Sequence, residues 1–156
     1  MNTRTFVPLP CSPTRLWGGA LLAALLLSAC GGGAAGPIGW QAGAPGSWSS
    51  AKHPGERLSA THEPFQGAPS DLASRILESV VLAPGGGKML RTNAMGECPG
   101  AAGEMEFARK NPPRRIVVFF SVRNNVSYEI RWSGSVNDVL PPEVLAFAQR
   151  RLCRVI

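Results

Sequence analysis

Two apolar segments on either side of an Asn-Asn pair constrain the fold more than any other part of the sequence. They cover residues 115–122 and 126–132 and are rich in Val, Ile and aromatic side chains. Segments of this composition around a short polar pair are typical of antiparallel strands joined by a tight turn. The sequence therefore predicts a β-hairpin at the centre of the folded domain.

The register of this hairpin depends on the length of its loop. A two-residue loop, Asn124-Asn125, would pair Val122 with Ser127, whereas a three-residue loop would pair Val122 with Val126. We favour the longer loop because it collects the apolar side chains on one face. That face would carry Ile116, Val118, Phe120, Val122, Val126, Tyr128, Ile130 and Trp132, opposite a mixed face with Arg115, Val117, Phe119, Ser121, Ser127, Glu129 and Arg131.

Weaker patterns flank the hairpin. Ser70 or Asp71 can cap a helix, and an apolar stripe at helical spacing follows them and ends before a Pro-Gly-Gly-Gly run. Alternating segments at 88–94 and 104–109 predict two further strands, and residues 142–153 predict a final helix with Glu early and Arg late. We therefore expect an α+β domain over residues 70–156, with an antiparallel meander of about four strands, an N-terminal helix and a C-terminal helix.

Glycine and proline are concentrated before this domain. Residues 31–69 contain nine Gly and five Pro and show no apolar periodicity. This composition predicts a flexible tether over residues 30–69. Trp40 and Trp48 interrupt it, and they could pack on the domain, lie at a membrane interface or stack on a glycan; packing is the interpretation we prefer.

The first 29 residues have the pattern of a signal peptide. Arg4 and Arg15 precede a 14-residue apolar segment, which is shorter than a membrane-spanning helix requires. The segment ends in Leu27-Ser28-Ala29-Cys30, which resembles the lipobox of bacterial lipoproteins. The resemblance implies that Cys30 is acylated and becomes the mature terminus; the alternative is an ordinary secretory signal. Gly31 is not the Asp that retains such lipoproteins in the inner membrane, so we expect the outer membrane, facing the periplasm, in a diderm bacterium.

Processing would leave two cysteines in the exported domain. With Cys11 removed and Cys30 acylated, Cys98 and Cys153 form an even pair in an oxidising compartment, which predicts a disulfide. A reactive thiol at Cys98 is the alternative. The chain has no Cys-x-x-Cys pair, and we expect no metal and no cofactor.

The order of these features is similar to that of uncharacterised small bacterial lipoproteins. Cys98-Pro99-Gly100 precedes a strand, an aromatic hairpin follows, and Cys153 closes the last helix. The resemblance covers roughly residues 40–153. It implies an α+β fold with a disulfide, and it implies no activity.

Residues suited to catalysis are sparse. His53 and His62 are the only histidines, and both lie in the predicted tether, which positions a catalytic group poorly. Glu97, Glu104 and Glu106 are the candidates for acid–base chemistry, but the alternation of the last two with apolar residues is typical of a solvated strand face. We therefore predict a non-enzymatic protein of the cell envelope, with a small envelope enzyme or a carrier of apolar ligands as the alternative.

Positive charge indicates the kind of partner. The chain has 16 Lys and Arg against 10 Asp and Glu, and removal of the signal peptide leaves 14 cations, or about +4. An arginine stripe with one aromatic residue would form a binding surface for an envelope protein or an anionic envelope polymer; its residues are Arg115, Phe119, Arg123 and Arg131. Ordinary surface arginines are the alternative. Nucleic acid is not expected, because an exported and membrane-tethered domain rarely meets it.

Overall fold

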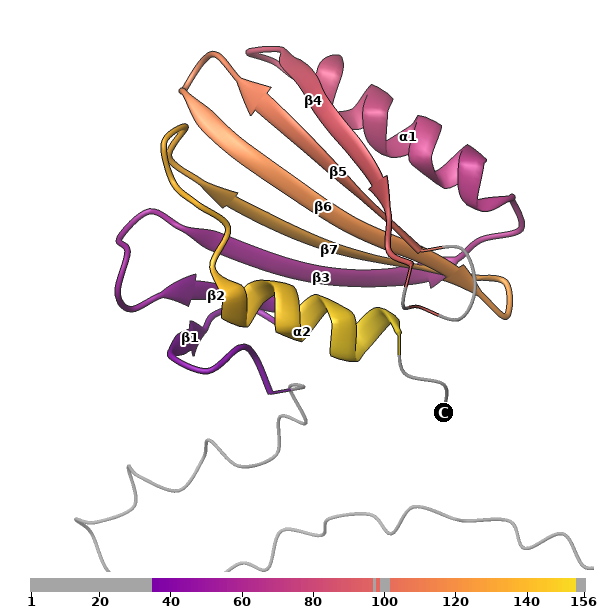
Figure 1. Ribbon diagram of the computed structural model, residues 1–156, viewed down its shortest axis with the longest axis horizontal. Helices are drawn as coiled ribbons and strands as arrows, with labels where there is room; N and C mark the ends of the chain where they lie inside the picture. The colour runs from indigo at the N-terminus through magenta and orange to yellow at the C-terminus, as the bar shows by residue number, and fades with distance from the viewer. Residues whose placement is uncertain (1–34, 97, 99–101, 154–156) are drawn as a thin grey trace, which may run out of the picture. The chain divides into compact units, whose positions relative to one another are not determined.

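The computed structural model describes residues 35–96, 98 and 102–153, and these contain seven strands and two helices. The strands form one antiparallel sheet in the order β1-β2-β3-β7-β6-β5-β4 (Figure 1). Residues Gly33–Ile156 make up one compact unit. The elements are β1 (Trp40–Ala42), β2 (Ser47–Ser50), β3 (Arg57–Pro64), α1 (Pro69–Val81), β4 (Gly87–Ala94), β5 (Ala102–Arg109), β6 (Arg114–Arg123), β7 (Val126–Gly134) and α2 (Pro142–Leu152).

The predicted α+β class, with about four strands and an N-terminal helix, is wrong. The fold is mostly β, and three strands precede α1 within the segment 30–69 that we expected to be a flexible tether. Its glycines serve as turns: Gly39, Gly46 and Gly55 all have positive φ at the ends of these short strands. The glycines that suggested a flexible tether are therefore turn residues between short strands.

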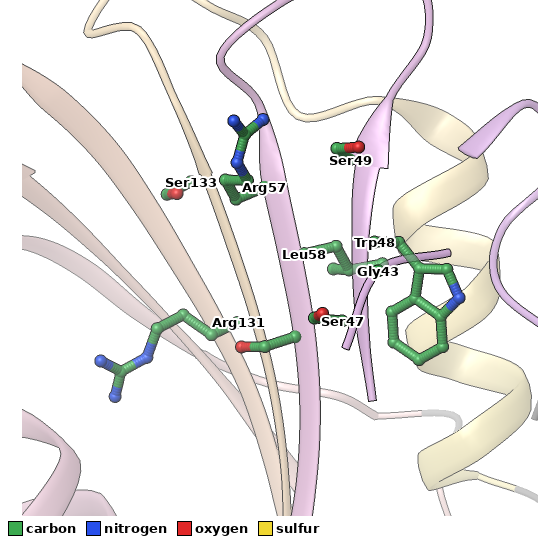
Figure 2. A pocket seen from close by; sticks show the side chains of 9 residues that line it. Gly43, Ser47, Trp48, Ser49, Arg57, Leu58, Arg131 and Ser133 are labelled. Atoms are coloured by element: carbon green, nitrogen blue, oxygen red, sulfur yellow. The ribbon is translucent and has the colours of Figure 1, made fainter. Parts of the chain in front are cut away.

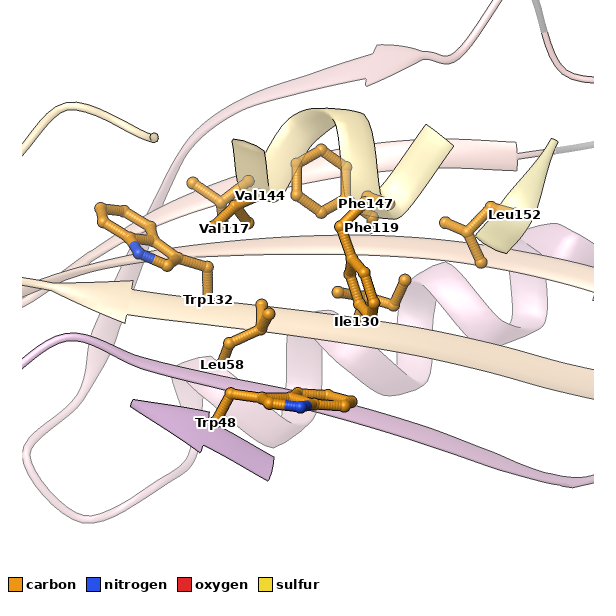
Figure 3. Close-up of a cluster of buried hydrophobic side chains, with 10 residues drawn as sticks. Trp48, Leu58, Val117, Phe119, Ile130, Trp132, Val144, Phe147 and Leu152 are labelled. Atoms are coloured by element: carbon orange, nitrogen blue, oxygen red, sulfur yellow. The ribbon is translucent and has the colours of Figure 1, made fainter. Parts of the chain in front are cut away.

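The two helices cover opposite faces of the sheet. Successive side chains of a strand point to opposite faces, and in β6 each set packs beneath a different helix. The cluster under α2 contains Trp48, Leu58, Val117, Phe119, Ile130, Trp132, Val144, Phe147, Ala148 and Leu152 (Figure 3). The cluster under α1 contains Leu72, Ile76, Val80, Met105, Phe107, Ile116, Val118 and Phe120. Burial on both faces explains why β6 is apolar along nearly its whole length.

The predicted three-residue loop between β6 and β7 is also wrong. Val122 pairs with Ser127 across the two-residue loop. Asn124 and Asn125 both adopt left-handed φ, 52° and 59°, as the tight hairpin turn that matches strand twist requires. The prediction collected the apolar side chains on one face and expected the mixed face to be solvated or partly covered. Because α2 covers that mixed face, Phe119 pairs with Ile130 on a second apolar face.

Trp48 joins β2 to the rest of the domain. Its indole is buried, and the ring lies edge-on to Phe147 of α2 with centroids 5.3 Å apart. Gly36 passes so close to this indole that a Cβ at residue 36 would overlap the ring. Trp40 packs half-buried against the same cluster. The interpretation that both tryptophans pack on the domain is confirmed, and the contact with Trp48 begins at Gly36.

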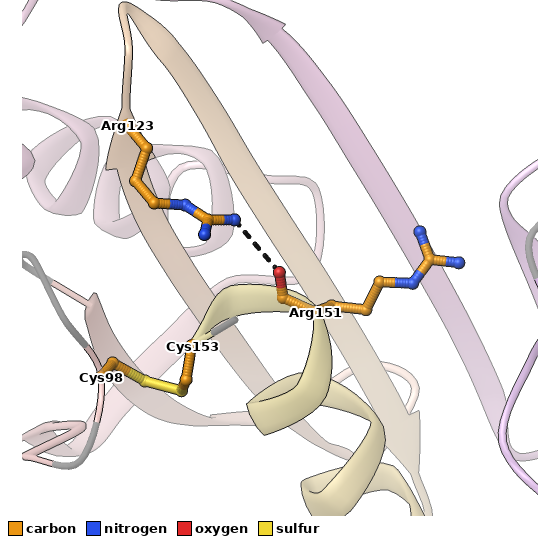
Figure 4. The surroundings of a disulfide bond; sticks show 4 residues. All are labelled: Cys98, Arg123, Arg151 and Cys153. Atoms are coloured by element: carbon orange, nitrogen blue, oxygen red, sulfur yellow. Dashed lines mark hydrogen bonds between the residues drawn. A yellow bond between two sulfur atoms is a disulfide. The ribbon is translucent and has the colours of Figure 1, made fainter. Parts of the chain in front are cut away.

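The predicted disulfide joins Cys98, in the segment between β4 and β5, to Cys153 at the end of α2 (Figure 4). Their Cα atoms are 4.3 Å apart across a sequence separation of 55. Beside it, the Arg123 guanidinium donates a hydrogen bond of 3.1 Å to the carbonyl of Arg151. The last turn of α2 is thus fixed both to the β4–β5 segment and to the end of β6.

The predicted signal peptide and Cys30 lie outside the described residues. Within those residues, neither helix has the length and apolar character needed to cross a membrane.

Candidate functional site

The four residues predicted to form a binding surface do not lie on one surface. Phe119 is fully buried beneath α2. Arg115 binds the Glu106 carboxylate at 2.6 Å, and the Arg123 guanidinium lies 4.9 Å from the centre of the Tyr128 ring. Arg131 is on the opposite face, because it pairs with Val118 of the cluster under α1. The predicted surface is therefore divided by the sheet itself.

Arg131 belongs instead to an open part of the α1 side of the sheet. Helix α1 packs mainly against β4, β5 and β6 and touches β7 and β3 through the Ser79–Arg131 and Arg75–Glu63 contacts. A hollow of about 340 Å³ lies over β2, β3 and β7, with Gly43, Trp48 and Leu58 also lining it (Figure 2). We call its polar residues the polar face: Ser47, Ser49, Arg57, Ser59, Arg131 and Ser133.

Strand register arranges the polar face in two rows. One row crosses the three strands as Ser49, Arg57 and Ser133. The other crosses them as Ser47, Ser59 and Arg131. Directly opposed residues in an antiparallel sheet have Cβ atoms about 5 Å apart. In the first row Arg57 lies directly between the two serines, and in the second Arg131 lies beside Ser59, with Ser47 on the far side of Ser59.

The two arginines have different surroundings. Arg131 contacts the Glu129 carboxylate at 2.9 Å and the Ser79 hydroxyl of α1 at 3.3 Å, which fixes its position between β7 and α1. Arg57 is exposed, and its guanidinium donates a hydrogen bond of 3.0 Å to the Glu56 carbonyl. It forms no ion pair with an acid among the described residues. The face thus offers guanidinium donors and serine hydroxyl groups to an anionic, polar ligand.

The polar face lay outside our sequence-based candidates except for Arg131. The segment predicted to be a flexible tether contains Ser47, Ser49, Arg57 and Ser59. A signal was present, because buried Trp48 and Leu58 alternate with these polar residues at the period of a strand. The segments are too short for that alternation to stand out.

The acids considered for catalysis are held in ion pairs on the α2 side of the sheet. Glu106 is buried between Arg91 and Arg115, at 2.5 Å and 2.6 Å, and Glu104 contacts Arg91 at 3.0 Å. Burial alone would raise the pKa of Glu106, but the hydrogen bonds and charges of Arg115 and Arg91 hold that pKa below its ordinary value. Glu106 is therefore ionised at neutral pH and is a poor proton donor there; Glu97 lies outside the described residues.

The histidines lie on the folded domain, contrary to the prediction of a tether. The His62 ring on β3 stacks on Tyr128 with centroids 6.2 Å apart, and His53 follows β2 in the loop toward β3. No group of three His, Cys, Asp or Glu in the described part of the chain could hold a metal ion.

Glu56 is the other buried acid. It precedes β3 and is 3% exposed. Burial raises its pKa, and the nearby Asp138 carboxylate adds to the shift, while His53 and the side chains of Ser50 and Trp132 partly oppose it. The Glu56 side chain is therefore largely removed from solvent.

No family model and no curated protein sequence matches the chain. Among solved structures, the solution structure of the cyanobacterial PsbP protein (CyanoP) from Synechocystis sp. PCC 6803 is similar to it, with a TM-score of 0.47 and 14% sequence identity. The match covers 64% of this chain and 71% of that chain. At this level the similarity supports no inference about this chain.

Proposed function

We propose that this protein is a lipid-anchored, non-catalytic binding module of the bacterial cell envelope. Its ligand would be an anionic polymer rich in hydroxyl groups, bound at the polar face. The observation that carries the proposal is the pair of rows that combine Arg57 and Arg131 with four serines on β2, β3 and β7, beyond the strands against which α1 packs.

The chemistry of these rows suits a glycan that carries carboxylates. A guanidinium group binds a carboxylate through two parallel hydrogen bonds, and serine hydroxyl groups both donate to and accept from sugar hydroxyl groups. Positioning on paired strands keeps the donors preorganised, which lowers the entropic cost of binding. An open face of this kind accommodates a continuous polymer strand.

The anchor in this proposal is Cys30. Its support is the sequence: a short apolar segment, small residues before the cysteine, and a glycine run after it. Two or more acyl chains would hold the protein stably on a membrane. In a diderm bacterium the domain would then lie on the outer membrane and face the periplasm.

Intact-mass measurement of protein extracted from the host membrane tests the anchor. We expect a chain that begins at Cys30 and carries the mass of a diacylglycerol, with or without an additional acyl chain. Changing Cys30 to alanine should abolish that added mass. A soluble, unmodified mature chain as the main species would contradict the proposed anchor.

Co-sedimentation with purified peptidoglycan sacculi tests the ligand. We expect the unit Gly33–Ile156 to pellet with sacculi, and the double variant Arg57→Ala with Arg131→Ala to bind at least tenfold more weakly, because both rows lose their guanidinium group. High salt should weaken binding by the unaltered unit.

The matched control for this experiment is Arg75→Ala with Arg150→Ala. It also removes two exposed arginines that do not line the polar face: Arg75 of α1, which pairs with Glu63 of β3, and Arg150 of α2. We expect this variant to bind sacculi like the unaltered unit. Equal binding by the polar-face variant and the control would contradict the proposed site.

A further inference from the structure

β4 and β6 begin and β5 and β7 finish at the same end of the sheet (left in Figure 1), and the segments there carry several exposed apolar residues. Leu82, after α1, and Val139, before α2, are each 78% exposed, and Ile38, before β1, is 86% exposed. We call this end, with its loops, the apolar end. Its exposed apolar side chains are Ile38, Val81, Leu82, Met89, Leu90, Val136 and Val139.

Three arginines at the turn between β5 and β6 connect the loops of the apolar end. Arg109 donates to the carbonyl of Pro84 in the α1–β4 loop. Arg114 donates a hydrogen bond of 2.9 Å to the carbonyl of Gly55, before β3. Arg115 donates one of the same length to the carbonyl of Asp138, before α2. The loops that carry Leu82, Val136 and Val139 are therefore fastened to the sheet.

Positive charge surrounds these apolar side chains. Lys52, Lys88 and Lys110 are exposed on or beside the same loops, and none forms an ion pair with an acid in the described part of the chain. Of the acids nearby, Glu56 is buried, and the Asp138 carboxylate accepts a hydrogen bond from the Ser135 amide. The remaining ones, Glu78 and Glu143, lie on the helices.

The chain enters the sheet at this same end. Trp40 of β1 pairs with Ser50, the last residue of β2, close to the start of β3. If Cys30 is the anchor, it lies six residue steps before Gly36, which is packed against Trp48. A chain of that length spans at most about 20 Å. This step rests on the proposed function, whereas the apolar and charged surface does not.

We propose that the apolar end is a membrane-contact surface that binds anionic phospholipid. Exposed apolar side chains enter the interfacial region of a bilayer, and the lysines around them bind lipid phosphates. A concentration of large exposed apolar side chains is unusual on a soluble domain without a partner. The strands then rise from the membrane, and the polar face remains open to the envelope.

Vesicle co-sedimentation of the acyl-free unit Gly33–Ile156 tests this surface. We expect the unit to bind vesicles of equal phosphatidylglycerol and phosphatidylcholine at least tenfold more tightly than vesicles of phosphatidylcholine alone. Leu82→Ser with Val139→Ser should weaken binding at least tenfold by removing two exposed apolar contacts. Lys88→Glu with Lys110→Glu should remove the preference for phosphatidylglycerol.

The control variant is Arg75→Glu with Arg150→Glu, which makes the same charge change away from the apolar end. It should bind phosphatidylglycerol vesicles like the unaltered unit, and an equal loss in this control would overturn the proposal. In the unaltered unit, vesicles should slow amide exchange in residues 82–86 and 136–139. Absence of that protection, or of a phosphatidylglycerol preference, would also overturn it.

Because the unit lacks Cys30 and these variants leave the polar face intact, the result is independent of the proposed anchor and ligand. Loss of sacculus binding with retained vesicle binding would refute the proposed function alone. Loss of vesicle binding with retained sacculus binding would refute the membrane-contact surface alone.

Discussion

Changing Phe119 to alanine is expected to lower the free energy of unfolding by about 3–5 kcal/mol. Phe119 is fully buried in β6, between Ile130 and the underside of α2. Truncation removes the contacts of the ring and leaves a cavity that the surrounding sheet and helix fill only partly. Since small domains are stable by about 5–15 kcal/mol, this loss is a large part of the total.

Urea denaturation followed by tryptophan fluorescence measures this change. Leu90→Ala is the matched control, because Leu90 is also a large apolar residue of a strand but is 52% exposed. We expect the control to change stability by less than about 1 kcal/mol. A similarly small change for Phe119→Ala would contradict the buried position and restore Phe119 as a surface residue.

Loss of the disulfide is expected to have an effect of similar size. The bond between Cys98 and Cys153 closes a loop with a sequence separation of 55. In the chain-entropy description, such a crosslink stabilises the folded state by about 4 kcal/mol because it restricts the unfolded chain. Cys98→Ser with Cys153→Ser should therefore lower the urea midpoint strongly, and α2 should be the first element to lose protection from amide exchange.

A reducing agent provides the control for the disulfide experiment. Dithiothreitol should lower the midpoint of the unaltered unit toward that of the double serine variant and leave the variant unchanged. The same midpoint for the unaltered unit with and without reductant would show that the bond contributes no stability. Thiol counting on the denatured, unreduced unit should find no free cysteine.

Several elements could be predicted from local pattern. The apolar stripe after Pro69 predicted α1, and the segment that begins at Pro142 predicted α2; the structure confirms both helices at nearly the same bounds. The strands at β4 and β5 and the hairpin itself are also confirmed. Capping residues, proline and the alternation of apolar with polar residues act over a few neighbouring residues, so the sequence alone is enough to recognise them.

The candidate site could not be predicted in the same way. Strands β1 and β2 are three and four residues long, too short to show a period among glycines and serines. Arg57 reaches Ser49 and Ser133 only through pairing with β2 and β7, and Ser133 is far from it along the chain. Local propensity carries no information about such long-range partners.

By itself, the sequence determined the two helices, the central hairpin and the cysteine pair that joins α2 to the segment before β5. Tertiary structure alone decided the hairpin register, the burial of Phe119, and the inclusion of β1–β3 in the sheet. The physical reason is that each of these depends on which faces of the sheet are covered. Burial by α2 makes a second apolar face favourable, and no stretch of neighbouring residues specifies where a distant helix packs.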